Sequence, residues 1–310
     1  MARIFITGAA GFIGSHTADQ LLAAGHEVLG IDNLRTGKRE NLAAAGQHPT
    51  FSFEEADVRD AGRMYEAVRG FCPDAIIHLA AVVSVQECIE KPALNFDVNV
   101  GATKVIAEAA RLAKVARIVF ASSAAVYGDA STPPLGESDP SSPASPYGWA
   151  KSASESLLTL FAEYYQLHPV IFRYFNVYGP RQDPSSPYSG VISVFNRRMA
   201  ARNAVTIYGD GEQTRDFVSV RDVARANLIA ATRESIPAGC YNIATGRARS
   251  LNQIHDILRE IYPDAPPPAF APSRQGDIRY SCGDPSKTRA ALGFSAEVSL
   301  EEGLQELAAI

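Results

Sequence analysis

The chain of 310 residues has no long apolar run and no cluster of positive charge. No stretch approaches the roughly 20 apolar residues of a membrane-spanning helix, and the first predicted strand begins too near Met1 to leave room for a signal peptide. Charged residues of both signs are dispersed and the net charge is -5, which argues against a nucleic-acid-binding surface. We therefore expect a cytoplasmic protein that neither enters a membrane nor binds nucleic acid.

The chain is also poor in cysteine. None of its four cysteines stands in a C-x-x-C pair or clusters with the six histidines as metal ligands do. We expect no metal site, and buried thiols at Cys72, Cys88, Cys240 and Cys282. Apolar residues make up 46% of the chain, enough for a sizeable core, and the length favours two domains.

A Gly-rich stretch near the amino terminus predicts a nucleotide-binding turn. An apolar run typical of a buried parallel strand leads into three glycines at intervals of three, and then into a helix whose free amides can meet a phosphate. Gly8 permits a tight turn, Gly11 lets the backbone approach a pyrophosphate, and Gly14 lets the helix lie close to the strand. Phe12 and Ile13 begin that helix. Such spacing alone also occurs in Gly-rich turns of other α/β proteins.

The residues that follow complete a βαβ unit. Apolar positions recur at helical spacing after Gly14, Gly25 ends the helix, and residues 28–31 form a second buried strand. Asp32 comes 18 residues beyond Gly14, where a carboxylate can accept both hydroxyls of an adenosine ribose. Its charge repels a 2′-phosphate and so favours NAD over NADP, although Arg35 is placed to hold that phosphate.

Strand and helix signals alternate through the first half, which predicts an α/β fold with a doubly wound parallel Rossmann-type sheet. The predicted strands are 4–7, 28–31, 51–53, 75–80, 117–121 and 170–175. The predicted helices lie near 12–24, 60–70, 98–114 and 147–166. Ligands of such sheets bind beyond the carboxyl ends of the strands. There we expect Asp57 and Val58 beside an adenine, and Ala80 and Ala81 along the path of the dinucleotide.

The second half predicts a smaller C-terminal α/β substrate domain. After Asn176 the alternation becomes irregular, and a late apolar strand at 240–244 returns to the sheet. We therefore predict an NAD-binding domain and a substrate domain that are interleaved along the chain. The first takes residues 1–175 and about 221–249, and the second takes 176–220 and 250–310.

Two stretches rich in Pro and small residues, 128–146 and 262–276, are predicted to be surface connections rather than core, and neither is expected to hold a helix. The first joins two elements that carry candidate catalytic residues. Since long loops inside compact domains are often functional, this loop is a candidate lid.

Ser123, Tyr147 and Lys151 form the predicted catalytic set. Ser123 ends the fifth predicted strand, and the i, i+4 spacing of the other two places them on one helix face, about 6 Å apart at Cβ. We expect the ammonium, helped by a positive nicotinamide, to favour the phenolate; lowering the phenol pKa by about three units from its usual value near 10 takes roughly 4 kcal/mol. Tyr147 would then act as general base and acid on a substrate hydroxyl. A lone Tyr-x-x-x-Lys is more often a surface pair, and the strand-end serine and the nucleotide turn favour catalysis.

Seven motifs, in order and over nearly the whole chain, resemble those of the extended short-chain dehydrogenases/reductases, most closely the UDP-glucose (UDP-galactose) 4-epimerase group. The motifs are Thr7–Gly14, Asp32–Leu34, Asp57–Val58, His78–Ala81, Ser122–Gly128, Tyr147–Lys151 and Arg173–Arg181. The resemblance implies that NAD stays bound as a catalyst. Hydride leaves C4 of the sugar while the tyrosine takes the 4-hydroxyl proton, the 4-keto sugar turns over, and hydride returns to its other face without net redox change.

The resemblance also assigns binding residues. It implies that NAD is held by Gly8, Gly11, Phe12, Ile13, Gly14, Asp32, Asn33, Asp57, Val58, Leu79, Ala80, Ala81, Asn99, Ser122, Tyr147, Lys151 and Tyr174. It implies that a UDP-sugar is held by Ser84, Ser123, Tyr147, Asn176, Gly190, Val191, Thr206, Tyr208, Arg215, Arg274 and Ser281. Among these, Arg215 and Arg274 supply the fork geometry and permanent charge that a diphosphate needs.

Two positions depart from the family pattern. Val83 stands where some members carry a lysine near the nicotinamide. Ser281 aligns with a residue beside the sugar 2-substituent, where a bulky tyrosine would restrict the pocket to glucose and galactose. Serine leaves room for an N-acetyl group, so UDP-N-acetylglucosamine is a further candidate substrate.

Other functions remain open at this stage. A nucleotide-sugar 4,6-dehydratase or decarboxylase would need an acid pair where Ala124 and Ala125 stand. A non-catalytic NAD-sensing protein and a reductase that consumes exchangeable NAD(P)H are the other candidates. Helices 98–114 and 147–166 are apolar on more than one side, which indicates either a homodimer or deeper burial within the monomer.

Overall fold

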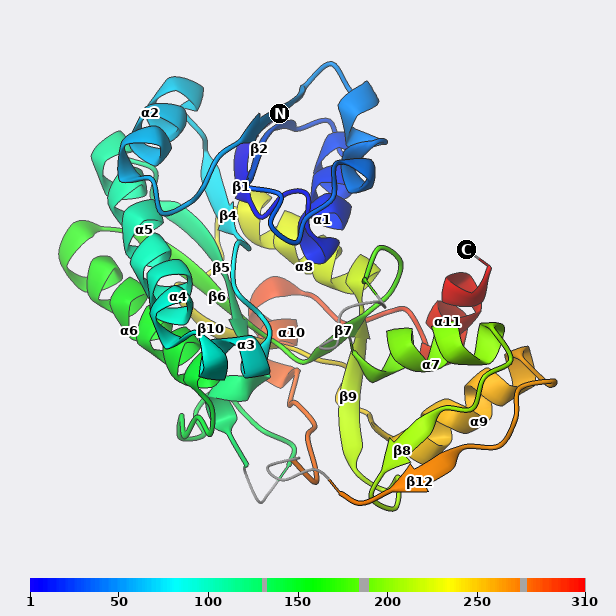
Figure 1. Cartoon of the computed structure of the whole chain (residues 1–310). Helices are drawn as coiled ribbons and strands as arrows, with labels where there is room; N and C mark the ends of the chain where they lie inside the picture. The colour runs from blue at the N-terminus through cyan, green and yellow to red at the C-terminus, as the bar shows by residue number, and fades with distance from the viewer. Residues whose placement is uncertain (130–132, 184–189, 274–277, 310) are drawn as a thin grey trace.

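The computed structural model describes residues 1–129, 133–183, 190–273 and 278–309. Its largest element is a seven-stranded parallel sheet in the order β10-β6-β5-β4-β1-β2-β3 (Figure 1). The strands are β1 (Arg3–Thr7), β2 (Glu27–Asp32), β3 (Phe51–Glu55), β4 (Ala75–His78), β5 (Arg117–Ser123), β6 (His168–Tyr174) and β10 (Gly239–Ile243). The order turns back beside β1, as in a doubly wound sheet, and confirms the predicted fold class.

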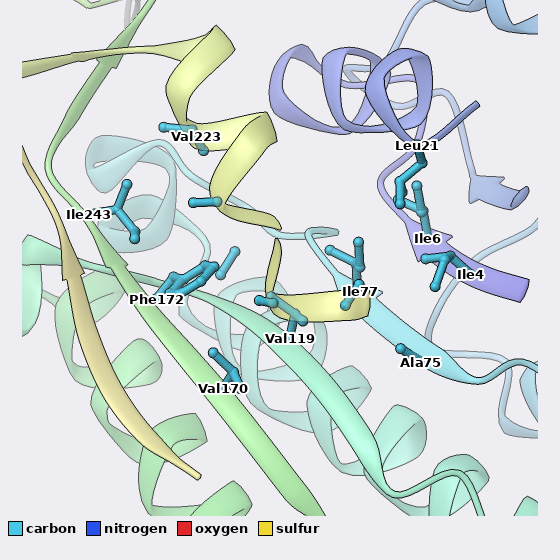
Figure 2. Packing of buried hydrophobic residues seen from close by; sticks show 14 of the residues in the cluster. Ile4, Ile6, Leu21, Ala75, Ile77, Val119, Val170, Phe172, Val223 and Ile243 are labelled. Carbon is cyan, nitrogen blue, oxygen red and sulfur yellow. The ribbon is translucent and has the colours of Figure 1, made fainter. Parts of the chain in front are cut away.

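Helices cover both faces of this sheet because successive side chains along each strand point to opposite faces, and both faces are apolar. On one face Ile4, Ile6 and Phe172 pack with α1 (Phe12–Ala23) and α8 (Val220–Thr232), as Figure 2 shows for Leu21 and Val223. On the other face lie α2 (Ala61–Phe71), α5 (Ala102–Ala113) and α6 (Pro146–Tyr165), whose apolar sides pack on residues such as Phe5 and Phe120. Burial on both faces explains the nearly continuous apolar strands of the sequence.

Smaller elements lie to one side of the sheet and have a core of their own (Figure 1). A three-stranded sheet has the order β11-β9-β7, and β8 pairs with β12. These elements are β7 (Asn176–Tyr178), α7 (Val191–Ala200), β8 (Thr206–Tyr208), β9 (Thr214–Ser219), β11 (Ala248–Ser250), α9 (Leu251–Ile261), β12 (Ala269–Ala271) and α11 (Leu300–Ala308). The remaining helices of the described residues are α3 (Val85–Glu90), α4 (Pro92–Phe96), α10 (Ser286–Leu292), the π-helical η3 (Asp97–Gly101) and the short 3-10 helices η1 (Arg39–Leu42), η2 (Ala45–Gln47) and η4 (Ala124–Tyr127).

The described residues of the stretch 262–276 hold no helix, as predicted, but they include β12, which pairs in parallel with β8. One expectation from the sequence is wrong. The thiols are not all buried: Cys88 is buried, Cys240 and Cys282 are half-buried, and Cys72 is exposed where α2 ends in a left-handed residue.

The described part of the chain contains no helix with the length and apolar content needed to cross a lipid bilayer. Within the same residues, no three His, Cys, Asp or Glu side chains are grouped so that they could hold a metal ion.

Candidate active site

The turn between β1 and α1 is packed so tightly that only glycine fits at two of its positions. Gly8 has φ +73°, and a Cβ there would lie 2.8 Å from the amide nitrogen of Ala80. A Cβ on Gly14 would lie 2.0 Å from the carbonyl oxygen of Gly8. Gly11 caps α1 without any side-chain hydrogen bond, so the first amides of the helix, including those of Phe12 and Ile13, keep their donors for an anion. The turn therefore fits the pyrophosphate of a dinucleotide.

Asp32, at the end of β2, is buried beside this turn. Its carboxylate accepts from the amides of Ala10 at 3.0 Å and Leu34 at 2.8 Å, and burial raises its pKa. Each oxygen has a second lone pair, so the carboxylate can still accept from two ribose hydroxyls. A Cβ on Gly37 would lie 2.9 Å from this carboxylate, so the backbone passes close to it.

Other predicted dinucleotide contacts surround Asp32. Asn33 donates to Asp57 at 3.0 Å, and the side-chain hydrogen bonds from Arg59 lower the pKa of Asp57. Val58 is buried in the apolar cluster on the α2 face, which leaves its backbone rather than its side chain for a ligand.

The end of β4 is tied to the glycine turn. Thr7 accepts from the amides of Leu79 at 3.1 Å and Ala80 at 3.3 Å, and its hydroxyl lies 2.6 Å from Nδ1 of His78. Leu79, Ala80 and Ala81 are half-buried. This edge therefore presents backbone and small side chains next to the turn.

Three further side chains predicted at the cofactor already have partners within the protein. The Asn99 amide pairs with both backbone groups of Val82 at 2.9 Å. The Ser122 hydroxyl donates to Glu155, and the Tyr174 hydroxyl donates to Asn227 at 2.7 Å. Their predicted contacts with a dinucleotide stay predictions.

The start of α6 brings Tyr147 to Ser123. Ser145 caps the helix by accepting from the Gly148 amide at 3.1 Å, and Pro146 occupies its first turn. A Cβ on Gly148 would lie 2.5 Å from the carbonyl oxygen of Ala125, so the helix start packs directly on the turn after β5. The side chains of Tyr147 and Ser123 are hydrogen-bonded, so a proton can pass between the two hydroxyl groups.

In the chain by itself the phenol pKa is raised, and the lowering expected from Lys151 together with a bound nicotinamide stays a prediction. Burial raises the pKa of Tyr147 to about 12, and the hydrogen bond with Ser123 offsets this only in part. The ammonium donates to the carbonyl oxygen of Ala121 at 2.7 Å and lies 5.9 Å from the centre of the Tyr147 ring. Burial in turn lowers the pKa of Lys151 to about 8. The lysine is thus cationic at neutral pH but turned toward β5.

The predicted substrate residues lie on several different elements. Ser84 caps α3 by accepting from the Glu87 amide at 3.0 Å. Asn176 is exposed at the first position of β7, directly after β6. Gly190 caps α7 and Val191 begins it, while Thr206 and Tyr208 are the two ends of β8.

Arg215 and Ser281 are brought together by the small sheet. Arg215 lies on β9, where its Nη1 donates to the carbonyl oxygen of Thr214 at 2.8 Å. The amide of Ser281 donates to the same carbonyl at 3.1 Å, and Ser281 is buried. Arg274 lies outside the described residues.

Sequence reasoning missed a buried carboxylate that orders this region. Asp216 accepts from the amides of Thr245 and Gly246 at 2.9 Å and of Gly283 at 3.3 Å. It thereby joins β9 to the segment that carries Ser281. In the sequence, only its position next to Arg215 indicated a role for Asp216. Its hydrogen-bond partners could not be found from spacing, because they lie about 30 and 67 residues away.

The comparisons with known proteins agree with this geometry. Residues 4–244 match the model of the NAD dependent epimerase/dehydratase family. A UDP-glucose 4-epimerase of Mycolicibacterium smegmatis is 40% identical over 306 residues, which are 97% of this chain and 96% of that protein.

Two solved structures share the fold throughout. The UDP-glucose 4-epimerase of Thermotoga maritima, solved with UDP-glucose, has a TM-score of 0.94 at 39% identity and covers 99% of this chain and 97% of its own. The UDP-N-acetylglucosamine 4-epimerase of Methanobrevibacter ruminantium, in complex with UDP-N-acetylmuramic acid, has a TM-score of 0.94 at 35% identity with the same coverage. The chain belongs to the NAD dependent epimerase/dehydratase family.

Proposed function

We propose that the chain is an NAD-dependent 4-epimerase of UDP-hexoses, which interconverts UDP-glucose and UDP-galactose through a transient 4-keto sugar. One observation carries the proposal: hydrogen-bonded Ser123 and Tyr147, with a buried lysine one helical turn away, stand at the end of a strand in the same sheet as the glycine turn. The family membership and the names of the relatives support the same reaction.

The residues at the glycine turn fit NAD. The amides that begin α1 would hold the pyrophosphate, Asp32 the adenosine ribose, and the segment 79–81 the path toward the nicotinamide. The two close approaches at Gly8 and Gly14 support this assignment because a side chain at either position would collide with backbone. Bound NAD would supply the hydride acceptor and donor at C4 of the sugar, and a positive ring near the phenol.

Tyr147 would exchange the proton of the 4-hydroxyl. With its pKa raised to about 12, the phenol is protonated at neutral pH and is ready to donate to a 4-keto oxygen. Acting as a base near pH 7 takes a downward shift of about five units, or roughly 7 kcal/mol of added stabilisation of the phenolate. The interaction with Ser123 acts in that direction, and the Lys151 cation together with the positive ring of bound NAD would add to it.

The substrate side would recognise the UDP group first. Arg215 and Arg274 would hold the diphosphate, Asn176 would add a hydrogen bond, and Thr206 with Tyr208 would flank the uracil. Ser281 is buried next to Arg215, and its small side chain supports acceptance of an N-acetyl group at the sugar 2-position.

The test is to incubate purified protein with UDP-galactose, without added cofactor, and to analyse the sugars. We expect UDP-glucose to form until equilibrium, and the N-acetyl pair to interconvert as well. A dehydrated sugar would favour the dehydratase alternative, and loss of reduced-cofactor absorbance in proportion to product would favour a reductase. An unchanged sugar would contradict the proposal.

We also propose that the chain forms a homodimer across α5 and α6. These helices are neighbours (Figure 1), and they leave five large apolar residues between 46% and 66% exposed: Leu112, Trp149, Leu160, Tyr164 and Tyr165. A Leu160→Asp variant should sediment as a monomer, whereas Phe270→Asp, at an even more exposed site on β12, should keep the dimer. A wild-type monomer would contradict this proposal. The interleaved division into NAD-binding and nucleotide-sugar-binding domains and the cytoplasmic location remain predictions.

A further inference from the structure

Helix α6 is fastened to the end of β5 at two successive strand residues. Lys151 donates to the carbonyl oxygen of Ala121 at 2.7 Å, and the hydroxyl of Ser122 donates to Glu155, one helical turn beyond Lys151. The next strand residue is Ser123. The contact at Glu155 therefore sets how far α6 lies along β5 just before the proposed catalytic serine.

Glu155 is held from the neighbouring strand by a buried arginine. Arg173 of β6 lies opposite Ser122 in the sheet register. Its Nε donates to one oxygen of Glu155 at 3.0 Å and its Nη2 to the other at 2.7 Å, and both side chains are less than 9% exposed. Such a bidentate pair fixes direction as well as distance.

The same arginine reaches the segment on the far side of Ser123. Its guanidinium lies 4.8 Å from the ring centre of Tyr127, in the turn that follows β5. The Tyr127 hydroxyl donates to Asn242 of β10 at 2.7 Å. Strands β5, β6 and β10 and helix α6 are thus joined around one charge pair.

Among the described residues, Glu155 is also the carboxylate whose charge acts on Lys151. The other titratable groups facing the lysine are His78 on β4, Cys88 on α3 and Tyr147 on α6. All three are neutral near pH 7, because their pKa values are about 3, 11 and 12. Glu155 raises the pKa of Lys151 against the effect of burial.

We propose that Glu155 and Arg173 are positioning residues for the proton transfer at Tyr147: the pair fixes α6 against β5 so that the phenol meets Ser123. The inference rests on the proposed function. A buried ion pair is seldom the most stabilising choice for a core, since burying each charge has a large desolvation cost. Its place between the two strand ends and the catalytic helix gives it a use in alignment and in keeping Lys151 cationic.

The first variant is Glu155→Gln, which keeps an oxygen for Ser122 but removes the charge. We expect kcat for UDP-galactose to fall about tenfold or more with KM within about twofold, because alignment affects the reacting atoms and leaves UDP binding intact. The alkaline limb of the pH profile should move to lower pH, since the anion is lost and the Arg173 cation is left unbalanced. Ser122→Ala should lower kcat while leaving that limb in place.

The control is Glu108→Gln on α5, which breaks a surface pair with Arg111 and should change neither kcat nor the limb. The double variant Glu155→Gln with Arg173→Gln removes both charges and should return the limb toward that of the wild type. Unfolding temperatures of all variants separate a loss of fold from a loss of alignment.

The decisive readout is independent of turnover: the titration of Lys151 by carbon-13 NMR of lysine-labelled protein, assigned with Lys151→Met. We expect the pKa of Lys151 to be about one unit lower in Glu155→Gln than in the wild type. If the wild type leaves UDP-galactose unchanged, the proposed function is overturned. If the wild type is active but Glu155→Gln has unchanged kcat and an unshifted Lys151 titration, the inference alone is overturned.

Discussion

The ammonium of Lys151 donates to the carbonyl oxygen of Ala121 at 2.7 Å and not to the phenol of Tyr147. The two side chains share a helix face, yet the ring centre of the tyrosine is 5.9 Å from the ammonium. An effect of the lysine on the phenol would therefore come from its charge, through space, rather than from a direct contact.

Replacing Tyr147 by phenylalanine removes the hydroxyl that exchanges the proton. We expect kcat to fall by about 10²–10⁴, the usual contribution of general acid–base catalysis, while the unfolding temperature stays within a few degrees. Tyr164→Phe, at an exposed position on the same helix, is the matched control and should keep full activity. Rate assays with UDP-galactose on both variants decide the matter, and comparable rates would remove Tyr147 from the mechanism.

A methyl group at Gly14 would lie 2.0 Å from the carbonyl oxygen of Gly8, so Gly14→Ala must displace the turn. We expect loss of bound NAD and a lower unfolding temperature. Gly70→Ala is the control, because a Cβ there meets nothing within 4 Å, and alanine lowers the conformational entropy of the unfolded chain, which stabilises α2 by about 0.5–1 kcal/mol. Cofactor content after purification is the measurement. A Gly14→Ala protein with full NAD content would contradict the assigned turn.

Asp216→Asn tests the carboxylate that joins β9 to the segment of Ser281. The amides of Gly246 and Gly283 both point at Oδ2, and an asparagine NH₂ in that place cannot accept from them. We expect a loss of about 1–3 kcal/mol in the free energy of unfolding and a raised KM for UDP-sugars, because Arg215 and Ser281 lose their alignment. Asp256→Asn, which is exposed, serves as control. An unchanged KM would mean that Asp216 serves stability only.

The lowered pKa of Lys151 predicts that activity and stability change in opposite directions as the pH rises. Its pKa is about 8 in the folded chain against 10.5 as the ordinary value, so above about pH 8 the cation is lost from the site and kcat should fall. Between about pH 8 and 10 the unfolded chain binds more protons at this group, and its contribution to the free energy of unfolding should rise with pH. Denaturant titrations of the wild type and Lys151→Met across this range give the difference. Parallel slopes would contradict the lowered pKa.

The sequence predicted what depends on local spacing. The glycine turn, Asp32 after the second strand and the Tyr147–Lys151 face each follow from intervals within one supersecondary unit. The pKa of Tyr147 could not be predicted in this way, because burial and the direction of the ammonium depend on β5 packing against α6. Glu155 was missed for the same reason, since its partners Ser122 and Arg173 lie 33 and 18 residues away.

The most direct test of the central claim follows hydrogen at C4. UDP-galactose deuterated at C4 is incubated with the protein in ordinary water, and the UDP-glucose formed is analysed by mass spectrometry and NMR. Removal and return of hydride within one site predicts that the deuterium stays at C4 of the product, with no reduced cofactor released. Exchange of the deuterium with solvent, or its loss into free reduced cofactor, would contradict the account.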